Sequence, residues 1–206
     1  YWEIPNVEYR NEIYTGRLLK KLLDNGNAKT QDDWIAYFIE AMKNKGFYTG
    51  SMPLQYSFFK ALSKLKTAEA GEARDFIQKQ MREKWLMTTT RIKYNPSGSD
   101  EIIHEYKMPD SFTKNIELVG KDKEINSKDS HILEALLLDN NPDEANKVFN
   151  YINGTNAWIW RLNKKPGQID ERVARFSASS GRAILYCDRD PAIRNSSLGV
   201  MVVEQK

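Results

Sequence analysis

Cysteine and histidine are scarce in this sequence. Its 206 residues include one cysteine, Cys187, and two histidines, His104 and His131. One cysteine cannot close an intrachain disulfide, and two histidines are too few for a multi-histidine metal centre. We therefore expect no disulfide, no metal site and no evident cofactor, with Cys187 as a buried, unreactive side chain. A chain without disulfides also suits the reducing cytoplasm, which is the compartment we expect.

Long apolar runs and catalytic motifs are also missing. No stretch approaches the roughly 18 apolar residues of a membrane-spanning helix, so we expect a soluble protein without a membrane partner. The sequence has no phosphate-binding loop of the Gly-x-x-x-x-Gly-Lys type, no Gly-x-Ser-x-Gly turn and no dinucleotide-binding glycine pattern. These absences lower the expectation of an enzyme without removing it. Apolar residues make up 40% of the chain, which is enough for a globular core.

Charge is nearly balanced overall but is unevenly distributed along the chain. Lysine and arginine number 31 against 28 acidic residues, a net charge of +3 that does not by itself indicate nucleic-acid binding. Residues 1–155 contain 22 basic and 23 acidic residues, whereas residues 156–206 contain 9 and 5. Six of the eleven arginines lie in this last segment. The final fifty residues are therefore the first place to look for a binding surface.

The first half of the sequence predicts mainly helices. After an irregular or extended lead-in over residues 1–14, apolar spacing and end signals predict helices over residues 16–24, 31–44, 52–65 and 68–86. Thr30 and Thr67 are the expected N-caps of the second and fourth helices. Residues 87–94 and 101–106 alternate in polarity and flank a turn-forming cluster, which predicts a β-hairpin.

The second half predicts two short helices and a sheet. A strand at 114–119 and a polar, exposed connection at 121–130 come first. The predicted helices cover residues 130–138 and 142–152, and the predicted strands cover residues 156–162, 171–178, 182–187 and 198–203. The runs 183–187 and 198–203 are apolar on both faces, so we expect both to be central, covered strands.

The predicted fold class is therefore α+β. A helix-rich N-terminal half with one β-hairpin precedes two short helices and a C-terminal antiparallel or mixed sheet of about four strands. Because both halves contain helices and strands, we expect one domain over residues 1–206. The alternative is two lobes, residues 1–120 and 130–206, joined by the exposed connection 121–130.

Three helices followed by a hairpin, over residues 31–106, is also the order of elements in a winged-helix DNA-binding domain. A recognition helix presents basic or amide side chains at its N-terminal end. The helix predicted over residues 68–86 is the last of these three and would be the recognition helix. It begins instead with Glu69, Glu72 and Asp75, whose carboxylates would repel phosphate. We therefore prefer a helical layer packed on a hairpin.

The closing segment combines tryptophans with arginines. Trp158 and Trp160 alternate along the predicted strand, so both indoles point to one face. Indole rings and guanidinium groups together offer a stacking surface for bases or a site for another anionic ligand. The candidate binding residues are Trp158, Trp160, Arg161, Arg172, Arg175 and Arg182. In the structural alternative, the indoles pack against a helix and the arginines face water.

Two carboxylates, Asp188 and Asp190, follow the predicted strand at 182–187. At the end of a central strand they would bind a divalent cation or act as acid and base. Pro191 indicates that the strand has ended, which favours a simple turn. The small residues at 177–182 would suit an anion-binding turn, but a tight hairpin turn is the preferred interpretation.

Three functions remain open from the sequence. The first is a cytoplasmic binding module whose C-terminal sheet meets an anionic partner such as nucleic acid. The second is a metal-dependent hydrolase or nuclease at Asp188 and Asp190, and the third is a protein-interaction or structural protein without catalysis. Exposed indoles beside the arginines would favour binding, and buried indoles would favour a structural role.

Overall fold

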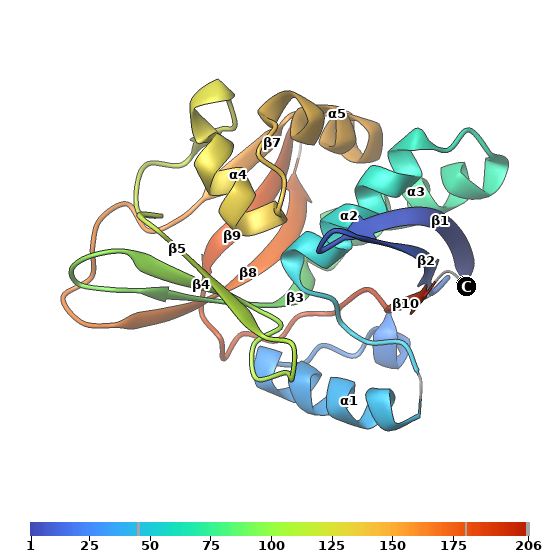
Figure 1. The fold of residues 1–206 in the computed structure, drawn as a ribbon, viewed down its shortest axis with the longest axis horizontal. Coiled ribbons are helices and arrows are strands. Elements are labelled where there is room, and N and C mark those ends of the chain that lie inside the picture. The colour runs from blue at the N-terminus through green and yellow to red at the C-terminus, as the bar shows by residue number, and fades with distance from the viewer. Residues whose placement is uncertain (45, 180, 205–206) are drawn as a thin grey trace.

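The computed structural model describes residues 1–44, 46–179 and 181–204, and these form an α+β fold. Figure 1 shows α4 and α5 together at the top of the view and α1 at the bottom, apart from the other helices. The helices are α1 (Gln31–Lys43), α2 (Met52–Lys64), α3 (Ala68–Glu83), α4 (Ser130–Leu137) and α5 (Pro142–Asn153), with 3₁₀ helices η1 (Leu23–Gly26) and η2 (Ser127–Asp129).

A mixed sheet of seven strands forms the centre of the described chain. The strand order is β5-β4-β3-β8-β9-β7-β6, and β7 and β9 are parallel while the other neighbours are antiparallel. The strands are β3 (Leu86–Tyr94), β4 (Asp100–His104), β5 (Phe112–Ile116), β6 (Lys123–Glu124), β7 (Ala157–Trp160), β8 (Asp170–Ser179) and β9 (Arg182–Arg189).

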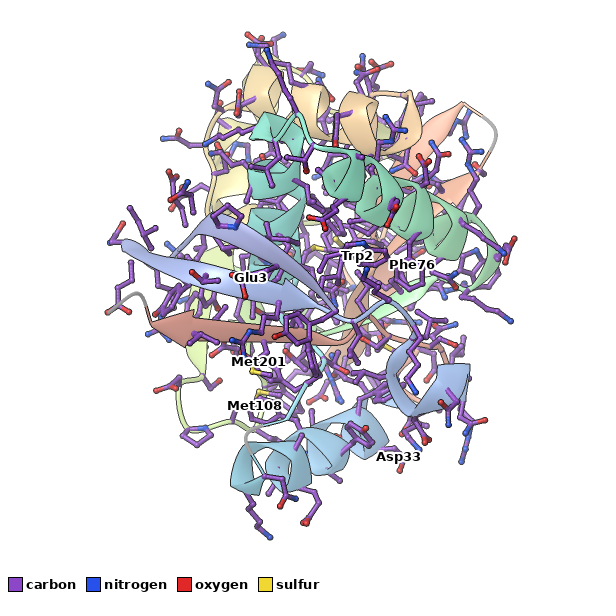
Figure 2. All side chains as sticks on the ribbon, turned by 90° about the vertical axis from the view of Figure 1, so that its right-hand side faces the viewer. Trp2, Glu3, Asp33, Phe76, Met108 and Met201 are labelled. Carbon is purple, nitrogen blue, oxygen red and sulfur yellow. The ribbon has the colours of Figure 1, made fainter. Side chains whose placement is uncertain are left out.

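A three-stranded sheet brings the two ends of the chain together. Strand β2 (Glu12–Leu18) pairs antiparallel with β1 (Trp2–Tyr9) on one side and with β10 (Val200–Glu204) on the other. Figure 2 views this sheet from outside, with Glu3 and Trp2 on β1. Glu3 is exposed, whereas Trp2 is buried and packs its ring 5.5 Å from that of Phe76 on α3. Because successive side chains of β1 point to opposite faces, Trp2 points inward and anchors α3 to the sheet.

Helix α2 lies at the centre of the main hydrophobic core. Ten of its thirteen residues are buried, as expected of a helix that is apolar on most sides. It packs against β1 on one side and against β3, β8, α4 and α5 on others. Two successive phenylalanines of α2 pack against different sheets. Phe58 adjoins Gly16 of β2, and the ring of Phe59 lies 5.2 Å from that of Phe176 on β8. The helix therefore joins the two sheets.

Helix α1 packs against β3 on the opposite face of the large sheet. Its Trp34 is fully buried in a separate cluster with Leu23, Met87 and Val173. The indole Nε1 donates a hydrogen bond of 2.8 Å to the backbone carbonyl of Asn195, which links α1 to the segment before β10. Because α1 and α2 lie on opposite faces of β3, the first three helices do not form the compact unit of a winged-helix domain.

Most predicted helices are confirmed, but the helix at residues 16–24 is wrong. The lead-in over residues 1–14 and the residues up to Leu18 form the β1–β2 hairpin instead. The following turn η1 contains Asp24 and Asn25 at φ values of 47° and 53°, which a right-handed helix does not allow. Of the closely spaced leucines that suggested a helix, Leu18 is buried on β2, and Leu22 and Leu23 are buried at the start of η1.

The predicted C-terminal sheet of about four strands is too small and partly misassigned. The large sheet also takes β3, β4 and β5 from earlier in the chain. The run 183–187 is confirmed as a covered central strand, since β9 lies between β8 and β7. The run 198–203 is not central: β10 is at the edge of the three-stranded sheet, with only an isolated bridge to Tyr48 on its other side in the described chain. Local apolarity does not reveal which sheet a strand joins.

Strand pairing crosses the proposed boundary between two lobes. Strand β3 pairs with β8, and β2 pairs with β10. The connection 121–130 is not uniformly exposed, because it contributes β6 and η2 and buries Ile125 and Asp129. One domain over residues 1–206 stays a prediction, which the shared core favours. No helix in the described ranges is long and apolar enough to cross a membrane.

Candidate functional site

Strand β7 presents its two indoles on the side of the sheet away from the main core. Ala157 and Ile159 are fully buried in the core, where α5 packs against β7. Trp158 and Trp160 alternate with them and are half-buried on the opposite face. The prediction that the two indoles share a face is therefore confirmed, and neither indole lies on the face that α5 covers.

Strand register brings arginines and another aromatic ring to the same face. Trp160 pairs with Tyr186 of β9, and Tyr186 pairs with Arg175 of β8. Directly paired residues of neighbouring strands point to the same side of a sheet. We call this surface the aromatic–arginine face and define it by Trp85, Trp158, Trp160, Arg175, Arg182, Tyr186 and Arg189.

The rings and guanidinium groups of the aromatic–arginine face are in direct contact. At one end, the guanidinium carbon of Arg182 lies 4.2 Å from the ring centroid of Trp158. Further along, Trp160 meets the ring of Tyr186 edge-on at 4.8 Å. All these separations are within the range of attractive aromatic and cation–π contacts.

Arg175 lies between the rings of Trp85 and Tyr186. Its guanidinium carbon is 4.4 Å from the Trp85 centroid and 4.7 Å from that of Tyr186. The residue is fully buried, and the only hydrogen bond of its side chain within the described chain runs from Nη1 to Oδ1 of Asn195 at 2.8 Å. Burial and the neighbouring charge of Arg189 lower the pKa of Arg175 to about 10. The side chain stays charged at neutral pH and is stabilised mainly by two π faces.

Within the described ranges, no carboxylate forms a close ion pair with the arginines of this face. Among the described residues, Arg175, Arg182 and Arg189 have no carboxylate oxygen within 4.0 Å. Arg189 instead lies 5.4 Å from the Trp85 centroid and 5.6 Å from that of Tyr186. Three guanidinium groups thus share one aromatic surface without a close ion pair in the described chain, and the nearest acidic influence on Arg175 and Arg189 is the charge of Asp188.

Two predicted binding residues lie elsewhere. Arg161 follows the end of β7, and its Nη1 donates a hydrogen bond of 2.9 Å to the carbonyl of Leu118. Arg172 forms two hydrogen bonds with the Asp170 carboxylate, at 2.8 and 2.7 Å. The structure therefore brings together Trp158, Trp160, Arg175 and Arg182 but not Arg161 or Arg172.

Three residues of the face were missed by reasoning from the sequence. Trp85 follows α3 at a φ of 52° and is 41% exposed, whereas the next residue, Leu86, is fully buried. Tyr186 could have been found from strand alternation with Arg182. Arg189 could not, because an irregularity in the β8–β9 register between Tyr186 and Arg189 changes the alternation.

The two aspartates of the alternative catalytic site differ in environment. Asp188 is partly buried, its Oδ1 has no hydrogen-bond partner in the described chain, and burial raises its pKa. Asp190 is exposed, and its Oδ1 accepts a hydrogen bond of 2.8 Å from the backbone N–H of Ala192, which is the geometry of a turn. No group of three or more His, Cys, Asp or Glu residues that could hold a metal occurs within the described ranges.

Strands β8 and β9 are antiparallel neighbours that pair up to the ends of the two strands. Ser179 pairs with Arg182, and Gly181 adopts a φ of 80°, which glycine allows without strain. Ser180, which belongs to the proposed anion-binding turn, lies outside the described residues.

No family model matches this chain, and no match was found among curated proteins or solved structures. Function is therefore inferred from the chemistry of the site.

Proposed function

We propose that this protein is a binding module whose aromatic–arginine face binds single-stranded nucleic acid. The observation that carries the proposal is the interleaving of indole rings with guanidinium groups that form no close ion pair with a carboxylate among the described residues. Proteins bind single strands by stacking bases on aromatic side chains and by holding the phosphates with cations. This face supplies both kinds of group.

In this proposal, different residues of the face contact the bases and the phosphates of the ligand. Trp85 is stacked on its inner side by buried Arg175, so its exposed part is available to a base. Arg182 is exposed and Arg189 half-buried, which leaves their guanidinium groups available to phosphates. Arg175 supports Trp85 from within and adds positive charge beneath it.

An anion would relieve a repulsion that exists within the face. Arg189 lowers the pKa of Arg175, because two nearby like charges disfavour each other. A phosphate beside Arg189 would offset this unfavourable charge density, and Arg182, at the other end of β9, would contact a separate phosphate. An acidic peptide would satisfy the charges but not the indoles, which is why nucleic acid is the preferred partner.

The direct test is fluorescence anisotropy with a labelled single-stranded oligonucleotide of about 12 nucleotides. We expect saturable binding at about 50 mM salt that weakens at about 300 mM. With Arg182 and Arg189 as the phosphate contacts, the slope of log affinity against log salt should be near −1.4, since each contact to a single strand contributes about −0.7. Absence of binding at about 50 mM salt would reject the proposal.

Matched variants distinguish binding at this face from nonspecific attraction of the oligonucleotide to positive charge. Arg182→Gln and Arg189→Gln should each weaken binding about fivefold to tenfold and make the salt dependence shallower. Arg74→Gln is the control, since Arg74 also lies over an aromatic ring, Tyr151 at 5.6 Å, but pairs with Asp75 at 2.7 Å. Equal losses in Arg74→Gln and Arg182→Gln would contradict the assignment of the face.

A further inference from the structure

Asn195 is the neutral partner of the buried guanidinium group of Arg175. Its Oδ1 accepts the hydrogen bond of 2.8 Å from Arg175 Nη1, and Asn195 itself is buried. The other two guanidinium nitrogens, Nε and Nη2, are buried and make no hydrogen bond within the described chain. The guanidinium group therefore keeps its positive charge beneath Trp85, with an amide rather than a carboxylate as its hydrogen-bond partner.

Backbone hydrogen bonds hold Asn195 in place. Its N–H donates to the carbonyl of Lys29 at 2.9 Å, and its carbonyl accepts from the Lys29 N–H at 3.0 Å. The same carbonyl accepts the hydrogen bond of 2.8 Å from Nε1 of Trp34, which is fully buried on α1. Three contacts within the protein thus fix Asn195 beside Arg175, so its position is preorganised before any ligand binds.

The neutral character of this partner has an electrostatic consequence. A carboxylate in place of the amide would form a charge-assisted hydrogen bond with Arg175 and cancel its charge. The amide accepts a hydrogen bond but leaves the charge in place, and water and salt screen a buried charge much less than an exposed one. Asp188 offsets this charge only in part, because it forms no ion pair with Arg175 in the described chain. A phosphate close to Trp85 is therefore attracted by Arg175 without touching it.

We propose that Asn195 is a positioning residue that makes the aromatic–arginine face specific for anionic ligands. It fixes Arg175 behind Trp85 without neutralising its charge. That charge adds to the attraction that Arg182 and Arg189 exert on phosphates. The inference rests on the proposed binding of single-stranded nucleic acid, and it assigns a role to a residue behind the ligand-binding surface.

Asn195→Asp tests the proposal, because aspartate has the size of asparagine and accepts the same hydrogen bond. Within the described chain the amide nitrogen of Asn195 donates no hydrogen bond, so the change breaks none. Fluorescence anisotropy with the labelled oligonucleotide of about 12 nucleotides, at about 50 mM salt, should show about fivefold weaker binding. The unfolding temperature should stay the same or rise, because Arg175 gains an ion pair. A purely structural role of Asn195 predicts wild-type affinity instead, since size and hydrogen bond are retained.

Asn11→Asp is the matched control for the change in net charge. Asn11 is exposed in the turn between β1 and β2, outside the aromatic–arginine face. Its φ of 66° is one that aspartate also tolerates. This variant should keep wild-type affinity. Equal losses in Asn11→Asp and Asn195→Asp would show an effect of net charge alone and would overturn the proposal.

Arg175→Met decides the outcome if Asn195→Asp does not fold. Methionine places a flexible apolar side chain between the two rings and removes the charge, so binding should again weaken about fivefold. Wild-type affinity in either variant would overturn the proposal but leave the proposed binding at the face intact. A lower unfolding temperature together with weaker binding in Asn195→Asp would also overturn it. Absence of oligonucleotide binding by the wild type would reject the proposed function itself, and this inference with it.

Discussion

At the scale of single residues, one buried carboxylate holds three segments together. Asp100 is fully buried and accepts hydrogen bonds from the backbone N–H groups of Asn95 and Leu118, at 3.0 and 2.8 Å. It also lies 2.6 Å from Nζ of Lys165. The carboxylate therefore connects the β3–β4 turn, the segment after β5 and the loop after β7.

Removing this carboxylate should destabilise the folded protein. We expect Asp100→Ala to lower the free energy of unfolding by about 3 kcal/mol, because two N–H groups and an ammonium group lose their acceptor. Urea denaturation followed by circular dichroism measures the change. Asp75→Ala is the control and should cost less than about 0.5 kcal/mol, since that side chain is 66% exposed. Similar stabilities of the two variants would contradict this role for Asp100.

His104 is a second buried polar residue, and its two ring nitrogens have different roles. Nε2 lies 2.8 Å from the carbonyl oxygen of Ala135, which can only accept, so Nε2 carries the proton and donates. Nδ1 then accepts a hydrogen bond from Thr90 Oγ1 at 2.9 Å. Burial, with a smaller contribution from the charge of Lys114, lowers the pKa of His104 to about 4.

This lowered pKa predicts a loss of stability in acid. Between pH 6.5 and pH 4 the unfolded chain takes up a proton at His104 and the native protein does not, so stability falls as pH falls. The loss should reach about 3 kcal/mol at pH 4, relative to pH 7. Urea denaturation at several pH values should show a shallower decline for His104→Gln than for the wild type. The same decline in both proteins would argue against this contribution.

At the scale of elements, close approach between α2 and the three-stranded sheet depends on a glycine. A Cβ atom at Gly16 of β2 would lie 2.7 Å from both Phe58 Cε1 and Val7 Cγ2. The ring of Phe58 therefore occupies the space that any other side chain at position 16 would need. Gly71 in α3 differs, because a Cβ there would meet nothing within 4 Å.

These two glycines predict opposite effects of the same substitution. Gly16→Ala should lower the free energy of unfolding by about 2 kcal/mol, since α2 and β2 must move apart. Gly71→Ala should raise it by up to about 1 kcal/mol, because alanine favours the helix and open space surrounds the position. Thermal denaturation of both variants checks the pair, and a change of the same sign in both would refute the packing argument.

At the scale of the whole molecule, one core joins the beginning and the end of the described chain. The main cluster contains Trp2 and Val200 as well as Cys187 on the central strand β9. Cys187 is fully buried, and burial raises the pKa of its thiol, so the thiol is unreactive in the native state.

A shared core predicts one cooperative unfolding transition. Reaction of Cys187 with a thiol reagent, the loss of helical circular dichroism and the change in tryptophan fluorescence should follow the same urea curve. Two lobes, residues 1–120 and 130–206, would instead unfold separately, and the thiol would become reactive at a different urea concentration from part of the helical signal. Coincident curves would support one domain.

Local signals explain why the helices were predictable. Thr67 accepts a hydrogen bond from Ala70 N, and Asn141 accepts from Asp143 N and Glu144 N, as expected of N-caps. Such interactions span three residues or fewer, so they can be read from neighbouring sequence. The shared face of Trp158 and Trp160 followed in the same way from the alternation of a strand.

The tertiary structure alone decided how distant segments meet. The sequence by itself determined the α+β composition, most helices and the location of the arginine excess. It did not determine the pairing of β10 with β2 or the approach of Trp85 to Arg175. These contacts depend on strand register and chain reversals across many residues, and apolar or charged character at one position does not specify its distant partner.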